Sequence, residues 1–507
     1  MSDWNMGYNT DILYTASYYH ELNPLNAQFA FLCRGYDFPP INENMTCCEL
    51  GFGMGLSLLI NSAAGPAWWA GTDFAPNQAL HAKSLAKDAN LTALVCDDAF
   101  DQFLAREDLP QFDFIVLHGI WSWIDPMFQD QILDFIKKRI KVGGVVYISY
   151  NASPGFLTME PARHLMHEYA NFLGLGVDRE QQMEIIRDFF KRLEQVAPVY
   201  YGYSPTVGPR VQKALEKSAH YLIHEYFNDA WHVDNRNDIV DKMRQAKLSY
   251  ITGSFAQEVV QNESMSPKSK ALLKKVSGTP VEQPLTNMMR NLQFMRDYYC
   301  CGPRQLSSLE QQERFEQCHF LSLVGEVKDG QECFSRYGIK TAINHNQYLV
   351  LDYLKDFKPH SFVEIREALS DHGFANASLI LLLMVLLDLT LITLVVPPEQ
   401  ISQESRERCA KLNDLLVDGK YDNKVNYLAS PAVQGGVHLY SEDLYMIKAY
   451  LKLGARDEES LLRLFKDESV YDDANMAPMS QEEEQVMYEI VHDFCCKIPL
   501  YQSLGII

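Results

Sequence analysis

Three glycines alternate where a hydrophobic strand pattern gives way to a helix pattern, in a stretch whose residue types suit a ligand cradle. Residues 45–55 read Met-Thr-Cys-Cys-Glu-Leu-Gly-Phe-Gly-Met-Gly, and an apolar helical pattern follows at residues 56–60. A strand, a glycine turn and a helix in this order can cradle a phosphate or a nucleoside. Glycine lets the backbone turn tightly and lets a ligand come close, and the helix start adds unpaired N–H donors.

The spacing of these glycines separates two kinds of site. Gly51, Gly53 and Gly55 alternate strictly, and Leu56 stands where a dinucleotide site of the form G-x-G-x-x-G would have its third glycine. Glu49 completes the pattern E-x-G-x-G-x-G. A nicotinamide-dependent dehydrogenase is therefore disfavoured, and a plain strand–helix turn without a ligand is the structural alternative.

Acidic residues follow the next two predicted strands. Asp73 ends a strand predicted over residues 67–72, and Asp98 follows another over residues 91–96. A carboxylate about 20 residues past a glycine turn commonly accepts hydrogen bonds from ribose hydroxyls, and Asp73 has that place. Capping of the following helix is the alternative for Asp98.

The elements around these residues predict an α/β fold with a doubly wound, Rossmann-like parallel sheet. Strand patterns recur at residues 112–117 and 145–150, with a helix pattern at 126–140 between them, which makes five strands alternating with helices. A sixth strand is expected over residues 248–252 and a seventh within 318–323.

The remaining patterns are mostly helical. Residues 11–34 read as a helix that either caps a ligand site or docks on the sheet, and residues 345–396 read as three helices and a strand in a winged-helix-like module. The expected organisation has four parts. They are a Rossmann-like core with its capping helix at 1–155, a helical insertion at 156–220, the completion of that domain at 221–324 and a mostly helical C-terminal region at 339–507.

The composition limits the partners expected for the protein and indicates its cellular compartment. The formal net charge of the 507 residues is −21, which repels phosphate backbones, so no nucleic-acid partner is expected. The 11 cysteines include three adjacent pairs and no C-x-x-C, which favours reduced thiols in the cytoplasm and gives no zinc motif. The apolar run at 379–396 contains Asp388 and favours a buried helix and strand over a membrane span.

Several segments together resemble a known family. The chain resembles bacterial class I S-adenosylmethionine (SAM) methyltransferases that carry a methyltransferase regulatory domain, a group that includes lysine methyltransferases acting on outer-membrane proteins. The segments that carry the resemblance are residues 14–24, Glu49 to Gly55, 71–73, 117–123 and 150–155, and more weakly 221–226. The resemblance implies SAM as cofactor, S-adenosylhomocysteine as product and a protein lysine as the favoured acceptor.

The resemblance also implies which residues act. The cofactor-binding residues expected from it are Tyr14, Glu49, Gly51, Gly53, Gly55, Asp73, Asp98, Ala99 and His118, with Asp98 and the Ala99 backbone beside the adenine ring. The expected catalytic residues, near the ends of the fourth and fifth strands, are His118, Trp121 and Tyr150. No metal is expected.

The chemistry of methyl transfer asks mainly for positioning and exclusion of water, and an amine acceptor must also be neutral when it attacks. His118 could take a proton or orient the acceptor, and the alternative is a histidine hydrogen-bonded at the pocket floor. An Asn-Pro-Pro-Tyr segment is missing after the fourth strand, which disfavours amide and adenine acceptors. A small-molecule methyltransferase, a SAM-binding scaffold without turnover and a homodimer are left open.

Overall fold

The computed structural model describes residues 15–174, 177–254, 265–334, 340–421, 425–466 and 481–507. Its centre is a seven-stranded sheet in the order β3-β2-β1-β4-β5-β7-β6. The strands are β1 (Thr46–Leu50), β2 (Trp68–Thr72), β3 (Leu94–Cys96), β4 (Phe112–Leu117), β5 (Ile140–Asn151), β6 (Leu248–Gly253) and β7 (Phe294–Cys301). The first five are parallel, and β7 and β6 add an antiparallel edge. The predicted doubly wound α/β fold is confirmed.

Alternate residues of the strands are buried on opposite faces of the sheet. Phe114 and Val116 pack on one face, and Ile115 and Leu117 of the same strand pack on the other. Both faces are apolar because helices cover both, as expected for a parallel sheet. The helices of this layered core are α1 (Pro24–Cys33), α2 (Leu56–Ala64), α3 (Pro76–Asp88), α4 (Phe100–Ala105), α5 (Pro126–Arg139) and α11 (Arg236–Gln245), with α13 (Pro267–Val276) and α14 (Glu282–Arg290) between β6 and β7.

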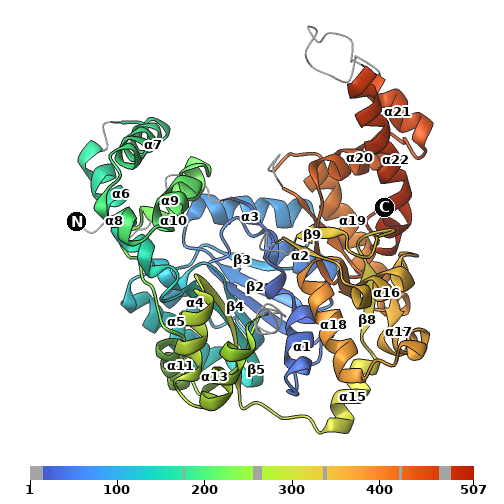
Figure 1. Ribbon diagram of the computed structural model, residues 1–507, viewed down its shortest axis with the longest axis horizontal. Coiled ribbons are helices and arrows are strands. Elements are labelled where there is room, and N and C mark those ends of the chain that lie inside the picture. Colours follow the sequence, from blue (N-terminus) through green and yellow to red (C-terminus); the bar gives the residue numbers. More distant parts are fainter. Residues whose placement is uncertain (1–14, 175–176, 255–264, 335–339, 422–424, 467–480) are drawn as a thin grey trace.

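A helical insertion follows β5 and lies at one side of the sheet in Figure 1. It consists of α6 (Glu160–Leu173), α7 (Arg179–Gln195), α8 (Val199–Tyr203), α9 (Val207–Leu215) and α10 (Ala219–Tyr226). Its buried residues form an apolar cluster of their own, which includes Met166, Ile186 and Val211. The expected divisions of the chain at residues 155, 220 and 324 stay predictions.

The C-terminal region lies on the opposite side of the sheet (Figure 1). It begins with α15 (Ser308–Glu316). A small antiparallel sheet follows, made of β8 (His319–Ser322), β11 (His360–Ser361) and β12 (Ile392–Val395). The same part of the chain contains the β9–β10 pair (Glu332–Phe334 and Lys340–Ala342) and the helices α16 (His345–Leu354), α17 (Phe362–Ala368) and α18 (Asn376–Asp388). This arrangement fits the winged-helix-like module expected there. It is followed by α19 (Gln403–Val417), the hairpin β13–β14 (Tyr427–Ser430 and Gly435–His438), α20 (Ser441–Lys452), α21 (Glu458–Lys466) and α22 (Gln481–Ser503).

Two expectations about secondary structure are wrong. The seventh strand of the sheet is β7, whereas residues 319–322 belong to the small sheet of the C-terminal region. The charged residues Arg296 and Asp297 interrupt the apolar pattern of β7, so the strand was not predicted. Asp297 is nevertheless fully buried, because it forms an ion pair with Arg236.

The N-terminal helix is also shorter than expected. It begins at Pro24 after the cap Asn23, whose side chain accepts from Leu25 N–H (2.8 Å), and a single short turn precedes it. Residues 15–19 form an irregular segment, and residues 11–14 lie outside the described part. The apolar run at 379–396 forms most of α18 and then β12. Among the described residues, no helix combines the length and the apolar character needed to cross a membrane.

Candidate functional site

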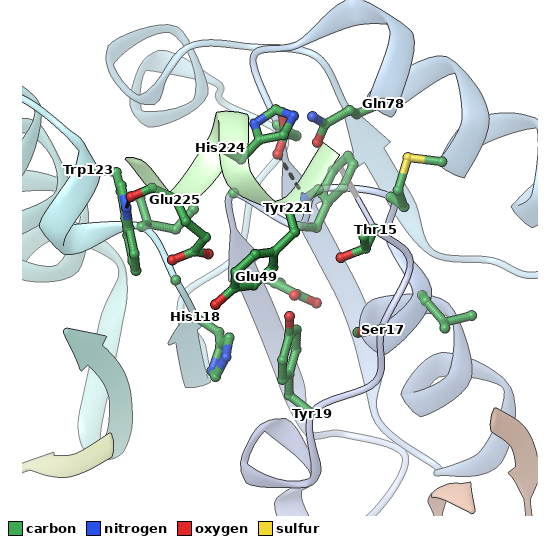
Figure 2. A pocket seen from close by; sticks show the side chains of 18 of the residues that line it. Thr15, Ser17, Tyr19, Glu49, Gln78, His118, Trp123, Tyr221, His224 and Glu225 are labelled. Atoms are coloured by element: carbon green, nitrogen blue, oxygen red, sulfur yellow. Dashed lines mark hydrogen bonds between the residues drawn. The ribbon is translucent and has the colours of Figure 1, made fainter. Parts of the chain in front are cut away.

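A cavity of about 290 Å³ opens at the carboxyl edge of the parallel strands (Figure 2). This place is where ligands bind in doubly wound sheets, and the volume is near the lower end of the roughly 300–1,000 Å³ usual for small-molecule sites. The N-terminal segment, the β1–α2 turn, the ends of β2 and β4, α10 and the start of β7 all contribute. Its lining includes Thr15, Ser17, Tyr19, Glu49, Gly51, Gly53, Gly55, Asp73, Gln78, His118, Trp123, Asn151, Tyr221, His224, Glu225, Phe294 and Arg296.

The glycine turn between β1 and α2 has a backbone that favours glycine. The φ angles of Gly51, Gly53 and Gly55 are 69°, 57° and 77°, in the left-handed region that side chains disfavour. A Cβ on Gly51 would overlap Ile120, and one on Gly55 would lie 2.6 Å from the Ala82 Cβ. The turn therefore keeps a bare stretch of backbone facing the cavity.

Asp73 braces this turn from the end of β2. Gly53 N–H donates to its Oδ2 (2.8 Å) and Ala75 N–H donates to its Oδ1 (3.0 Å). Burial raises the pKa of Asp73 to about 6, although both hydrogen bonds act in the opposite direction. Each oxygen still has a second lone pair, so the carboxylate can accept from ligand hydroxyls as well.

Glu49 has a buried oxygen without a protein partner. Its side chain is only 4% exposed, and Oε2 has no hydrogen-bond partner among the described residues. Burial, and then the neighbouring charge of Asp73, raise the pKa of Glu49 to about 8. A ligand that carries a donor or a positive charge would satisfy this oxygen and favour its ionised form.

His118 is fixed by two aromatic neighbours. Its Nδ1 is hydrogen-bonded to the Tyr147 hydroxyl (2.8 Å), and its ring stacks on Tyr19 with centroids 3.7 Å apart. Burial lowers the pKa of His118 to about 3, so the imidazole is neutral near pH 7. It can orient a neighbour by hydrogen bonding, but it is a weak base.

Trp121 and Tyr150, expected as catalytic residues, do not line the cavity. Both are fully buried on one face of the sheet, in the apolar cluster that contains Ile115 and Leu117. Tyr150 donates to Asp297 Oδ2 (2.7 Å), and Trp121 packs under the Lys242 ammonium, 5.2 Å from its ring centroid. Successive strand residues point to opposite faces, so Tyr150 lies on the face opposite Tyr147, and Trp121, which follows β4, packs in the same cluster as Tyr150.

The residues expected beside adenine also lie outside the cavity lining. Arg106 donates to Asp98 Oδ2 (3.1 Å), and Thr72 Oγ1 donates to the Asp98 carbonyl. Ala99 directly precedes α4, and its N–H donates to Gln102 Oε1 (3.1 Å). Tyr14 lies outside the described residues. The structure thus brings together Glu49, the three glycines, Asp73 and His118.

The wall formed by α10 was not anticipated from the sequence. Tyr221, His224 and Glu225 all line the cavity, whereas none of them was among the site residues expected from the sequence. The signal that could have found them is their spacing, since positions i, i+3 and i+4 share one face of a helix. Thr15, Ser17 and Tyr19 line the cavity from an irregular segment, whereas a helix that either caps the site or docks on the sheet was expected there.

Comparisons with known proteins match the chain over different lengths. Residues 218–301 match the family model described as a predicted methyltransferase regulatory domain, a segment that runs from α10 to β7. The uncharacterized protein sll1526 of Synechocystis is 32% identical over 323 residues, which are 63% of this chain and 63% of that protein. The chain thus spans less than two thirds of this relative's length. The uncharacterized protein RP789 of Rickettsia prowazekii is 23% identical over 300 residues, 57% of this chain and 52% of that protein.

A solved structure matches nearly the whole chain. PKMT2 from Rickettsia typhi in complex with AdoHcy has a TM-score of 0.69 at 16% identity, over 97% of this chain and 99% of that one. A second structure of PKMT2 from Rickettsia typhi has a TM-score of 0.67 at 14% identity, over 96% of this chain and 99% of that one. The chain thus has the fold of PKMT2, and its residues 218–301 match the model of a predicted methyltransferase regulatory domain, the domain that the sequence resemblance implied.

Proposed function

We propose that the protein is a SAM-dependent methyltransferase whose acceptor is the side-chain amine of a protein lysine. The observation that carries this proposal is one cavity in which the bare glycine turn, Asp73 and the orphaned Glu49 oxygen lie beside the aromatic and acidic wall of α10. The match to PKMT2, whose solved complex contains AdoHcy, supports it. We place the activity in the cytoplasm, where the 11 cysteines would stay reduced.

The residues present fit SAM. The positive φ angles of the turn let the ligand approach the backbone, and Asp73 can accept from ribose hydroxyls. Glu49 Oε2 provides an acceptor or a negative charge for a cationic ligand. Asp98 remains our proposal for the adenine amino group, although Arg106 occupies one side of its carboxylate.

When bound, SAM would supply a methyl group on a sulfonium for a neutral acceptor nitrogen, and the glycine turn, Asp73 and Glu49 would hold it. The protein contributes positioning and a dry environment. Tyr19, Trp123 and Phe294 line the cavity with apolar surface. His118 stays neutral and is locked by Tyr147, so it adds no positive charge next to the acceptor.

The test is methyl transfer from isotope-labelled SAM to lysine-containing proteins, read by mass spectrometry, together with SAM affinity by calorimetry. We expect label on lysine and binding by the wild type. Asp73→Ala should lose about 2–4 kcal/mol of SAM affinity, the equivalent of one or two hydrogen bonds to a charged group. Asp134→Ala, which removes an exposed carboxylate on α5, is the matched control and should bind as the wild type does. Unchanged SAM affinity in a folded Asp73→Ala would refute the cofactor site. SAM binding by the wild type without methyl transfer would favour the alternative of a SAM-binding scaffold without turnover.

A further inference from the structure

The order of the strands divides the cavity into two halves. From β2 through β1 to β4, β5 and β7 the strands are neighbours, and their edge residues follow in that order. Asp73 and the glycine turn lie at β2 and β1, whereas Trp123, Asn151 and Phe294 lie beyond β4, at β5 and at the start of β7. We call the second group, with the part of α10 that faces it, the acceptor half.

Glu225 belongs to this acceptor half. Trp123 Nε1 donates to the Glu225 carbonyl (3.1 Å), which ties α10 to the end of β4. Figure 2 shows the Glu225 carboxylate between Trp123 and the rings of Tyr221 and Tyr19. Burial is the main reason that the pKa values of Tyr19 and Tyr221 are raised, and the charge of Glu225 is the next. The carboxylate is therefore close to both phenols.

The charges nearby leave this half negative. Arg296 is the one Lys or Arg side chain among the described residues that line the cavity, and Glu21 pairs with it (3.3 Å). His118 is neutral near pH 7. Tyr19 thus lies near two carboxylates, those of Glu21 and Glu225, and near one guanidinium, that of Arg296, and its aromatic ring attracts cations.

We propose that the acceptor half is a cation-selective subsite in which Glu225 binds the ammonium group of the incoming alkylamine. Tyr19, Tyr221 and Trp123 pack along its alkyl stem and face its charge. This inference rests on the proposed function, since it names the group that recognises the lysine. A carboxylate–ammonium hydrogen bond is stronger than a neutral one, and an apolar surround strengthens it further.

Glu225→Gln tests the proposal, because it removes the charge and keeps the volume and the backbone contact to Trp123. The probes are two acetylated, amidated pentapeptides with a central lysine or a central norleucine, Gly-Gly-X-Gly-Gly, titrated calorimetrically with S-adenosylhomocysteine present. We expect the wild type to bind the lysine peptide about 10- to 100-fold more tightly than the norleucine peptide. In Glu225→Gln this preference should vanish, while the affinity for S-adenosylhomocysteine stays unchanged. Glu216→Gln, an exposed carboxylate just before α10, is the matched control and should keep the preference.

Each outcome decides the proposal. Equal binding of the two peptides by the wild type overturns the proposal. This test needs no variant, so it holds even if Glu225→Gln does not fold. A full preference in folded Glu225→Gln also overturns it, as does a loss of S-adenosylhomocysteine affinity with the preference retained, since Glu225 would then hold the cofactor. A preference that depends on Glu225 in a protein that transfers no methyl group supports the cation subsite and refutes only the proposed function.

Discussion

Glu49 is the residue whose protonation most directly links ligand binding to stability. Its pKa is raised to about 8 by burial and by Asp73, whose own pKa is raised to about 6. Both carboxyls therefore favour the protonated form in the folded cavity. A cationic ligand favours their ionised forms, so its binding releases protons and strengthens as the pH rises.

We predict that the wild-type affinity for SAM increases between about pH 6 and pH 8, and that Glu49→Gln flattens this rise. Calorimetry in buffers of different ionisation enthalpy would count the protons released. Asp73 leaves a smaller dependence around pH 6 in the variant. A wild-type affinity that is flat over this range, or that falls, would contradict the assignment of Glu49 to the cofactor's positive charge.

The same titration predicts the opposite trend for the protein without ligand. A carboxyl with a raised pKa contributes stability that is complete below its unfolded value of about 4.5 and is lost as the pH rises through about 8. Glu49→Gln removes this loss. Relative to the wild type, its free energy of unfolding should rise by on the order of 3 kcal/mol from pH 5 to pH 9, measured by urea denaturation. An equal pH dependence in both proteins would show that Glu49 keeps an ordinary pKa.

The surroundings of His118 favour a positioning role over proton transfer, because burial lowers its pKa and Tyr147 holds its Nδ1. With a pKa of about 3 it does not titrate between pH 6 and pH 9. His118→Ala should therefore lower the turnover number by about tenfold or more through loss of orientation, with the shape of the pH–rate profile preserved. Initial rates across that pH range test this. Loss of a neutral-pH limb in the variant would instead identify His118 as the general base.

The residues of the site could be predicted where a backbone requirement is visible in the sequence. Alternating glycines need positive φ angles, and Asp73 ends a strand, so both were found. Tyr150 was expected in the site, whereas Tyr147 is the residue that contacts His118. Strand parity decides between them, and a one-residue error in parity reverses the face. The spacing puts Glu225 on one helix face with Tyr221 and His224, but nothing local shows that this face turns toward the cavity.

At the scale of elements, the C-terminal hairpin braces the segment that supplies Tyr19 to the cavity. Gly435 and Gly436 of β14 pack against Tyr18, and a Cβ on Gly436 would lie 2.7 Å from its ring. Asn23 Nδ2 donates to the Val433 carbonyl (3.1 Å), and the Tyr18 hydroxyl donates to Asn61 Oδ1 (2.9 Å). The hairpin therefore contacts the chain on both sides of Tyr19, at Tyr18 and at Asn23, and Tyr19 lines the site.

Gly436→Ala should weaken SAM binding from outside the cavity. The added methyl group displaces Tyr18 and with it the neighbouring Tyr19, and overpacking of this kind costs about 1–3 kcal/mol of stability. Calorimetry and thermal denaturation measure the two effects. Gly202→Ala in α8 is the control, since a Cβ there meets no atom within 4 Å. Wild-type stability and affinity in Gly436→Ala would show that the hairpin does not brace this segment.

The elements of the sheet were predictable because buried parallel strands give continuous apolar runs between helices. β7 was not, since its buried ion pair interrupts such a run. The start of α1 was misplaced because Tyr14, Tyr18 and Leu22 happen to repeat at helical spacing, whereas Tyr18 is held by the distant hairpin. Tertiary packing overrides local pattern in both cases.

At the scale of the whole molecule, one apolar core joins segments more than 400 residues apart. Leu22, Cys47 and Leu59 share it with Leu428 and Phe494. Helix α19 and the β13–β14 hairpin pack directly on α2. The end of the chain is thus part of the layer that covers one face of the sheet. The helical insertion, in contrast, has its own smaller cluster.

These two cores predict two levels of stability. Elements that share a core open together, whereas a smaller separate cluster opens at lower free energy. Native-state hydrogen exchange in increasing urea should therefore group α19, β13 and β14 with β1 and α2, while α6 and α7 exchange earlier. S-adenosylhomocysteine should slow exchange in α10 and around the glycine turn, because the cavity joins the insertion to the sheet there. Exchange of the hairpin ahead of the insertion would contradict a single shared core and would leave the bracing of Tyr18 without support.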